Sequence, residues 1–130
     1  MCRDFAHRPH RRRYVKAPNA GASDHFGKAL TLSGDTLAVG AYGDDDGGSS
    51  AGAVYALFLD TGGAVVGAQK ISNSYGGLSS YYTLDAGDSF GVSVAAIGDL
   101  DGDGVADLAV GAIYDDDGGS NAGAVYVRFL

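Results

Sequence analysis

The stretch that decides the fold is "DSFGVSVAAIGDLDGDGVADLAVGAIYDDDGGSNAGAVYVRFL", residues 88–130, because it repeats an earlier part of the chain. Residues 24–59 read "DHFGKALTLSGDTLAVGAYGDDDGGSSAGAVYALFL", with the short sequences FG, GA and GAVY in the same order. Internal similarity of this kind indicates that one structural unit is built more than once. We therefore expect repeated units that pack on one another.

The two copies differ in length at one place. The offset between them grows from 64 residues at Phe26 and Phe90 to 71 residues at Gly40 and Gly111. The later copy holds the acidic loop "DLDGDGVAD", residues 99–107, where the earlier copy has only a short turn. Since the scaffold closes without this loop, the loop is an addition with its own purpose.

Each copy predicts three short strands separated by clusters of Gly and Asp. In the later copy the expected strands are 91–97, 106–113 and 122–129, with the second apolar on both faces and therefore central in its sheet. A fourth strand is expected at 68–72, where Lys70 and Asn73 match Lys16 and Asn19 near the start of the chain.

The composition supports an all-β protein. All 16 acidic residues are Asp, and 22 of the 130 residues are Gly, so turns are favoured and helices are disfavoured. No apolar run approaches a membrane span of about 18 residues, and the chain shows no secretory signal. Cys2 is the single cysteine, which excludes an intrachain disulfide.

Charge is divided unevenly along the chain. Residues 1–16 hold six basic residues and one acidic residue, whereas the remainder holds three basic and 15 acidic residues. A chain segment this acidic repels nucleic acid and anionic membranes and attracts cations. We therefore expect no nucleic-acid partner and no membrane insertion. The basic run at 8–13 is interpreted as a disordered flank, with a tail that binds nucleic acid or another anionic surface as the alternative.

These motifs together resemble the FG-GAP repeat, the blade of the β-propeller of integrin α subunits and of many bacterial surface and secreted proteins. The resemblance spans residues 14–130 and rests on Phe26-Gly27 and Phe90-Gly91, Gly40-Ala41 and Gly111-Ala112, and GAVY at 52–55 and 123–126. The Pro of the family's GAP sequence is replaced by Tyr42 and Ile113. The resemblance implies antiparallel four-stranded blades of an incomplete β-propeller, about 1.75 blades in this chain.

The expected organisation has four parts. They are a basic tail at 1–13, the last strand of a preceding blade with a linker at 14–23, a blade without a calcium loop at 24–87, and a blade with a calcium loop at 88–130 that lacks its fourth strand. About three repeats are usually needed for independent stability, so we expect a fragment, or a subunit that associates with further blades or with itself.

The acidic loop has the chemistry of a cation site. Its four carboxylates repel one another unless a cation lies among them, and Gly102 and Gly104 permit the tight wrap of backbone that this requires. Oxygen ligands without His or Cys specify a hard cation, and Ca²⁺ accepts irregular coordination better than Mg²⁺. An EF-hand is excluded, because its twelfth position is Val110 here. A metal-free Asp/Gly turn is the alternative.

The family resemblance implies calcium ligands at the positions of this sequence that match the family's calcium loop. They are the side chains of Asp99, Asp101, Asp103 and Asp107 and the backbone carbonyl of Val105. The acidic runs at 44–46 and 115–117 are interpreted as solvated turns, with a second cation or ligand site as the alternative.

The function expected from this resemblance is non-catalytic: a calcium-binding propeller segment of a secreted or cell-surface protein, for adhesion to a protein or glycan ligand. None of the serines lies in a G-x-S-x-G motif, and no pair among the carboxylates is singled out for catalysis. The alternatives are an accessory propeller domain of a larger enzyme acting on carbohydrate or lipid, and a fragment without a role of its own.

Overall fold

The computed structural model describes residues 21, 23–77, 83–116 and 118–130, and the structural statements below concern those residues. The expected basic tail at 1–13 lies outside them, as do residues 14–20 and 22 of the expected strand and linker at 14–23, residues 78–82 of the expected blade at 24–87, and Asp117. No helix in this part of the chain has the length and apolar character to cross a membrane.

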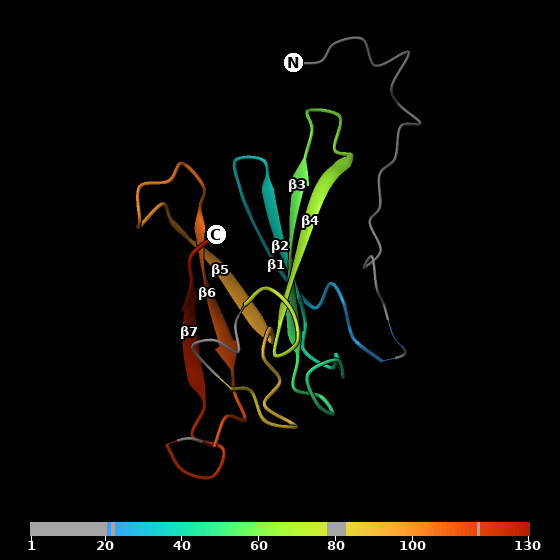
Figure 1. Cartoon of the computed structure of the whole chain (residues 1–130), viewed down its shortest axis with the longest axis vertical. Helices are drawn as coiled ribbons and strands as arrows, with labels where there is room; N and C mark the ends of the chain where they lie inside the picture. The colour runs from blue at the N-terminus through green and yellow to red at the C-terminus, as the bar shows by residue number, and fades with distance from the viewer. Residues whose placement is uncertain (1–20, 22, 78–82, 117) are drawn as a thin grey trace.

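The described chain is all-β and forms two antiparallel sheets, as the repeat predicts (Figure 1). The first sheet has the order β1-β2-β3-β4, with bounds Ala29–Ser33, Thr36–Ala41, Ala53–Leu59 and Val65–Ser72. The second has the order β5-β6-β7, with bounds Ser93–Gly98, Asp107–Ala112 and Ala124–Arg128. The expected central position of the second strand of the later copy, β6, is confirmed.

The first hairpin of each sheet shows where the two repeats diverge. Strands β1 and β2 are joined by Gly34 and Asp35, with Ser33 opposite Thr36 and Gly34 at φ 58°. Such a two-residue turn needs positive φ and matches the twist of the strands. In the second sheet the acidic loop replaces this turn, and the register of β5 on β6 shifts between Ala96 and Gly98.

The two sheets pack face to face through one apolar core. We call the face of the first sheet that carries Ala38, Val54 and Ile71 its Val54 face. It packs against Val110 and Tyr126 of the second sheet in a single buried cluster. Figure 1 shows the second sheet lying beside β1 and β2 rather than beside the outer strand β4.

Phe90 is the largest contribution of a loop to this core. Its side chain is fully buried and packs edge-on against the ring of Tyr126, with centroids 5.4 Å apart. Edge-to-face aromatic pairs of this kind stabilise by about 1 kcal/mol beyond the burial of their area. The phenylalanine of the second FG motif thus packs in the core at the boundary between the two repeats.

Backbone meets backbone where the repeats join. A side chain at Gly40 would place its Cβ atom 1.9 Å from the carbonyl oxygen of Gly91, and one at Gly52 would place it 2.1 Å from that of Phe90. Gly91 would in turn meet the carbonyl oxygen of Ala53 at 2.3 Å. The glycines of the GA, GAVY and FG motifs therefore permit a contact that any side chain would prevent.

Gly40→Ala should lower the free energy of unfolding by about 3 kcal/mol, because the new methyl group meets fixed backbone of the second repeat. The matched control is Gly111→Ala, whose Cβ would come too close to the Ser93 hydroxyl, at 2.4 Å, a group that can rotate away, and would lie at ordinary contact distances from the Cβ and carbonyl oxygen of Ser93. Urea unfolding of both variants checks this. Equal losses in the two would contradict the assigned joint.

Candidate functional site

The acidic loop is held in shape by its own first carboxylate. Asp99 Oδ1 accepts hydrogen bonds from the backbone N–H groups of Gly102 at 2.8 Å and Asp103 at 3.1 Å, and its Oδ2 accepts one from Gly104 at 2.7 Å. Gly102 and Gly104 have φ of 78° and 85°, which glycine adopts without strain. The expected tight wrap of backbone around Asp99 is thus present.

Asp107 anchors the other end of the loop. It is the first residue of β6 and is fully buried. Its Oδ2 accepts a hydrogen bond from Leu100 N at 2.8 Å, and its Oδ1 accepts one from Leu130 N at 3.0 Å. One buried carboxylate therefore ties the loop to the sheet and to the residues that follow β7.

The loop brings together three of the residues that the sequence suggests as ligands. Asp99, Asp101 and Asp107 each offer a carboxylate oxygen, and these three oxygens lie within 4.8 Å of one another. Asp103 stands outside this group, and its Oδ1 accepts a hydrogen bond from Val105 N at 2.9 Å. The geometry therefore supports three carboxylates as the centre of the site.

The carboxylates of the loop do not share the same electrostatic surroundings. Hydrogen bonds from backbone N–H groups, that of Gly104 first, lower the pKa of Asp99. Partial desolvation, followed by its hydrogen bond with Asp99 and the charges of Asp103 and Asp107, raises the pKa of Asp101. Within the loop, the ionised form is therefore favoured at Asp99 and disfavoured at Asp101. Three acidic oxygens around one point fit a hard cation such as Ca²⁺.

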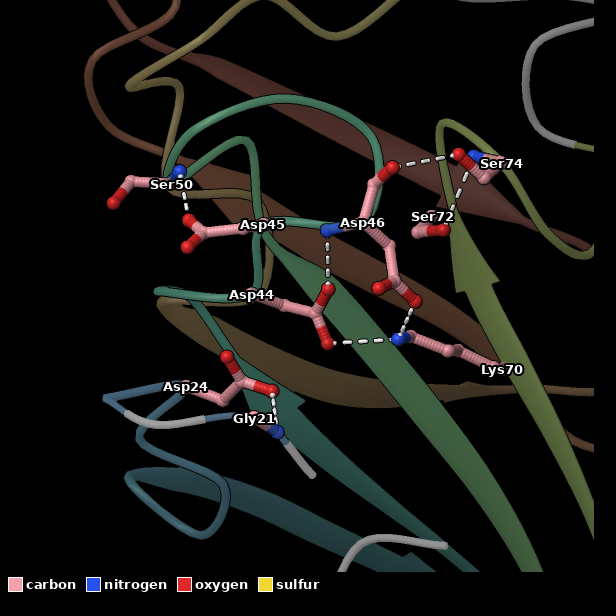
Figure 2. A network of polar contacts seen from close by, with 9 residues as sticks. All are labelled: Gly21, Asp24, Asp44, Asp45, Asp46, Ser50, Lys70, Ser72 and Ser74. Atoms are coloured by element: carbon pink, nitrogen blue, oxygen red, sulfur yellow. Dashed lines mark hydrogen bonds and ion pairs between the residues drawn. The ribbon is translucent and has the colours of Figure 1, made fainter. Parts of the chain in front are cut away.

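The other acidic run, at 44–46, departs at Asp44 from the solvated turn that the sequence suggests, whereas Asp45 and Asp46 are exposed. Asp44 is 1% exposed, because it points back toward the first sheet rather than toward water. Lys70 of β4 reaches it with Nζ 2.8 Å from Asp44 Oδ2 and also contacts the carboxylate of Asp46 (Figure 2). The interpretation as a solvated turn is wrong for Asp44, since a buried charge needs a partner and the neighbouring strand supplies one.

Two aromatic rings complete the surroundings of Lys70. Its Nζ lies 5.3 Å from the centroid of the Tyr55 ring and 5.4 Å from that of Tyr75, within range of cation–π attraction. Burial alone would lower the pKa of Lys70, but hydrogen bonds to Asp44 and Asp46 outweigh it and hold the pKa above its ordinary value. Burial raises the pKa of Tyr55, against the opposing effect of Lys70.

The second repeat keeps only part of this arrangement. Asp115, which corresponds to Asp44, is also 1% exposed and accepts a hydrogen bond from the hydroxyl of Tyr126. The expectation of a solvated turn is therefore wrong for Asp115 as well. The sequence alone does not connect Lys70 with Asp44 or Asp46, because these residues are 24 or more positions apart and meet only through the fold.

Models of the FG-GAP repeat match residues 14–58 and residues 90–127. The chain belongs to the FG-GAP repeat family. No curated protein matches it. The acidic loop of this FG-GAP chain lies inside the second matched segment, and Asp44 and Asp46, the acidic partners of Lys70, lie inside the first.

Lys70→Met should destabilise the fold by about 3 kcal/mol, because it leaves the buried charge of Asp44 without its cation. Lys28→Met removes the same charge from an exposed position and should change the free energy of unfolding by less than about 0.5 kcal/mol. Chemical denaturation of both variants at neutral pH measures the difference. A similar loss in both would show that overall charge, and not this ion pair, is responsible.

Stability should also fall in alkaline solution. The folded protein holds the protons of Lys70 and Tyr55 more tightly than the unfolded chain, whose ordinary pKa values are 10.5 and 10.0. Their contribution is therefore complete below about pH 10 and is lost as the pH rises beyond that value. Thermal melts from pH 8 to pH 11.5 should show the decline, with a shallower slope in Lys70→Met.

Proposed function

We propose that this FG-GAP chain is a calcium-binding, non-catalytic β-propeller segment of a secreted or cell-surface protein. The observation that carries the proposal is the convergence of Asp99, Asp101 and Asp107 at the turn between β5 and β6. The first repeat makes the same turn with two residues, so the added loop serves something other than closing the hairpin. Carboxylate oxygens gathered around one point are the ligands that Ca²⁺ takes.

Ca²⁺ at this site would be held by Asp99, Asp101 and Asp107, with Asp103 and the carbonyl of Val105 completing the set suggested by the sequence. Its positive charge would favour the ionised form of Asp101, whose pKa is raised by desolvation first and then by its hydrogen bond with Asp99 and the charges of Asp103 and Asp107. The loop is already ordered by the chain itself, since the hydrogen bonds to Asp99 shape it and the hydrogen bond from Leu100 to Asp107 fixes it to β6. The cation would make this end of the sheet rigid enough to present to a partner.

The partner proposed for this surface is an extracellular protein or glycan. The support is the family, whose repeats are typical of extracellular and surface proteins. The strong negative charge of the chain, −7 at pH 7, argues against partners that are polyanions. Binding to a glycan array in calcium and in chelator tests the adhesive role directly, with calcium-dependent retention expected.

Calcium should raise the melting temperature of the chain, because a ligand that binds only the folded form stabilises it. The rise should disappear in Asp101→Asn, which removes a ligand charge, and persist in Asp116→Asn, which removes an exposed charge from another loop of the same repeat. Melts in excess Ca²⁺, excess Mg²⁺ and chelator measure this. A rise of equal size with Mg²⁺, or in Asp101→Asn, would contradict the site.

Titration calorimetry of Asp103→Asn decides the role of the one acidic residue outside the group of three. If Asp103 completes the calcium site, the affinity should fall at least about tenfold. An unchanged affinity would remove Asp103 from the ligand set and leave Asp99, Asp101 and Asp107 as its core.

A further inference from the structure

The joint between the two repeats consists of two short backbone segments, which we call the plug and the socket. The plug, Gly87–Phe90, runs parallel to the socket, Ser49–Gly52, with Gly52 paired to Phe90. Backbone N–H groups of the plug donate to the socket at three points: Gly87 to Ser49 at 2.7 Å, Ser89 to Ser50 at 3.0 Å and Phe90 to Ala51 at 2.9 Å. Glycines at both sides allow the close approach described above.

A second socket, Ser120–Gly123, exists in the second repeat and has the same conformation as the first. Asn121 has φ 53° where Ser50 has 50°, and Gly119 has φ 136°, as does Gly48. The hydrogen bond of Gly52 N to Asp44 O at 3.0 Å is matched by Gly123 N to Asp115 O at 2.9 Å. Residues 120–122 are exposed, and within the described chain no hydrogen bond reaches their carbonyl oxygens.

A second plug, Ser23–Phe26, exists in the first repeat. His25 has φ 59°, identical to that of Ser89. The Asp24 carboxylate accepts a hydrogen bond from Gly21 N at 2.7 Å (Figure 2), as Asp88 does from Asp85 N at 2.8 Å. Gly27, which follows this plug, has open space where Gly91 meets the first repeat. The second plug is thus preformed: Asp24 and Phe26 pack on their own repeat, whereas Ser23, His25 and Gly27 are exposed.

The sheet faces beside these elements are apolar and exposed. Val125, Val127 and Phe129 are 72%, 40% and 49% exposed, on the face of the second sheet that corresponds to the buried Val54 face. Leu30 and Leu32 of β1 are 62% and 61% exposed. The residue that corresponds to Leu30 is Val94, which packs into the core between the sheets.

We propose that these surfaces join two copies of the chain head to tail, with the second plug of one copy in the second socket of the next. The joint inside the chain is the template, since each half of it recurs at an outer surface in the bonded conformation. Leu30 and Leu32 of one copy then pack on the Val125 face of its neighbour, as Val94 does on the Val54 face. The contact is heterologous, so the copies form a ring or an open series.

Sedimentation velocity of the 130-residue chain tests this. The wild type should show species heavier than the 13.1 kDa chain, increasingly so with concentration and with added salt, which screens the net charge of −7. Val125→Asp and Leu30→Asp should each weaken association about tenfold or more, because each places a charge in an apolar contact. Val66→Asp, at a 68% exposed position on β4, is the matched control and should associate as the wild type does.

Mixing the two defective variants gives the decisive result. Val125→Asp keeps an intact plug and Leu30→Asp an intact socket, so the equimolar mixture should form a species of two chains although neither variant alone does. A mixture that stays at the mass of one chain, a wild type that does so at all concentrations, or an equal loss in Val66→Asp would overturn the proposal. Circular dichroism confirms folding, and Val127→Asp with Leu32→Asp replaces a pair that fails to fold.

Discussion

The contact of bare backbone with bare backbone at the joint between the repeats is the constraint on which the rest of the structure depends. Gly40 and Gly52 leave room for the carbonyl groups of Gly91 and Phe90, so that the sheets approach closely enough to bury the Phe90 side chain completely. The core shared by the two sheets forms around that ring. Each repeat thus completes its neighbour, as expected for architectures in which one unit cannot bury its apolar face alone.

The chain neutralises its acidic loops in two different ways. At 44–46 a residue of the chain neutralises the buried carboxylate, because Lys70 of β4 forms an ion pair with Asp44. The Lys70 ammonium also lies over the ring of Tyr55. At 99–107 backbone N–H groups stabilise Asp99, whereas desolvation first, and then the hydrogen bond with Asp99 and the charges of Asp103 and Asp107, raise the pKa of Asp101. The first arrangement is complete within the chain, whereas the second is one that a cation would complete.

The repeat also explains why equivalent residues have opposite environments. Val54 and Val125 occupy the same position in their sheets, yet Val54 is fully buried and Val125 is 72% exposed, because only the first has a neighbouring sheet on its side. The alternation of Val125, Val127 and Phe129 identifies a shared face from the sequence, but it does not say whether that face is covered. Burial depends on the neighbour rather than on the strand itself.

The all-β class, the strands, the central place of β6 and the acidic loop that carries Asp99, Asp101 and Asp107 can all be predicted from the sequence. They depend on local patterns of period two and on turns of Gly and Asp. Only the tertiary structure showed that Asp44 and Asp115 are buried, that Lys70 is the partner of Asp44, and that Asp103 stands apart from the other three carboxylates. Those outcomes follow from which strands meet across the sheet and from how a short loop divides its backbone hydrogen bonds among like charges, and neither can be read from spacing along the chain.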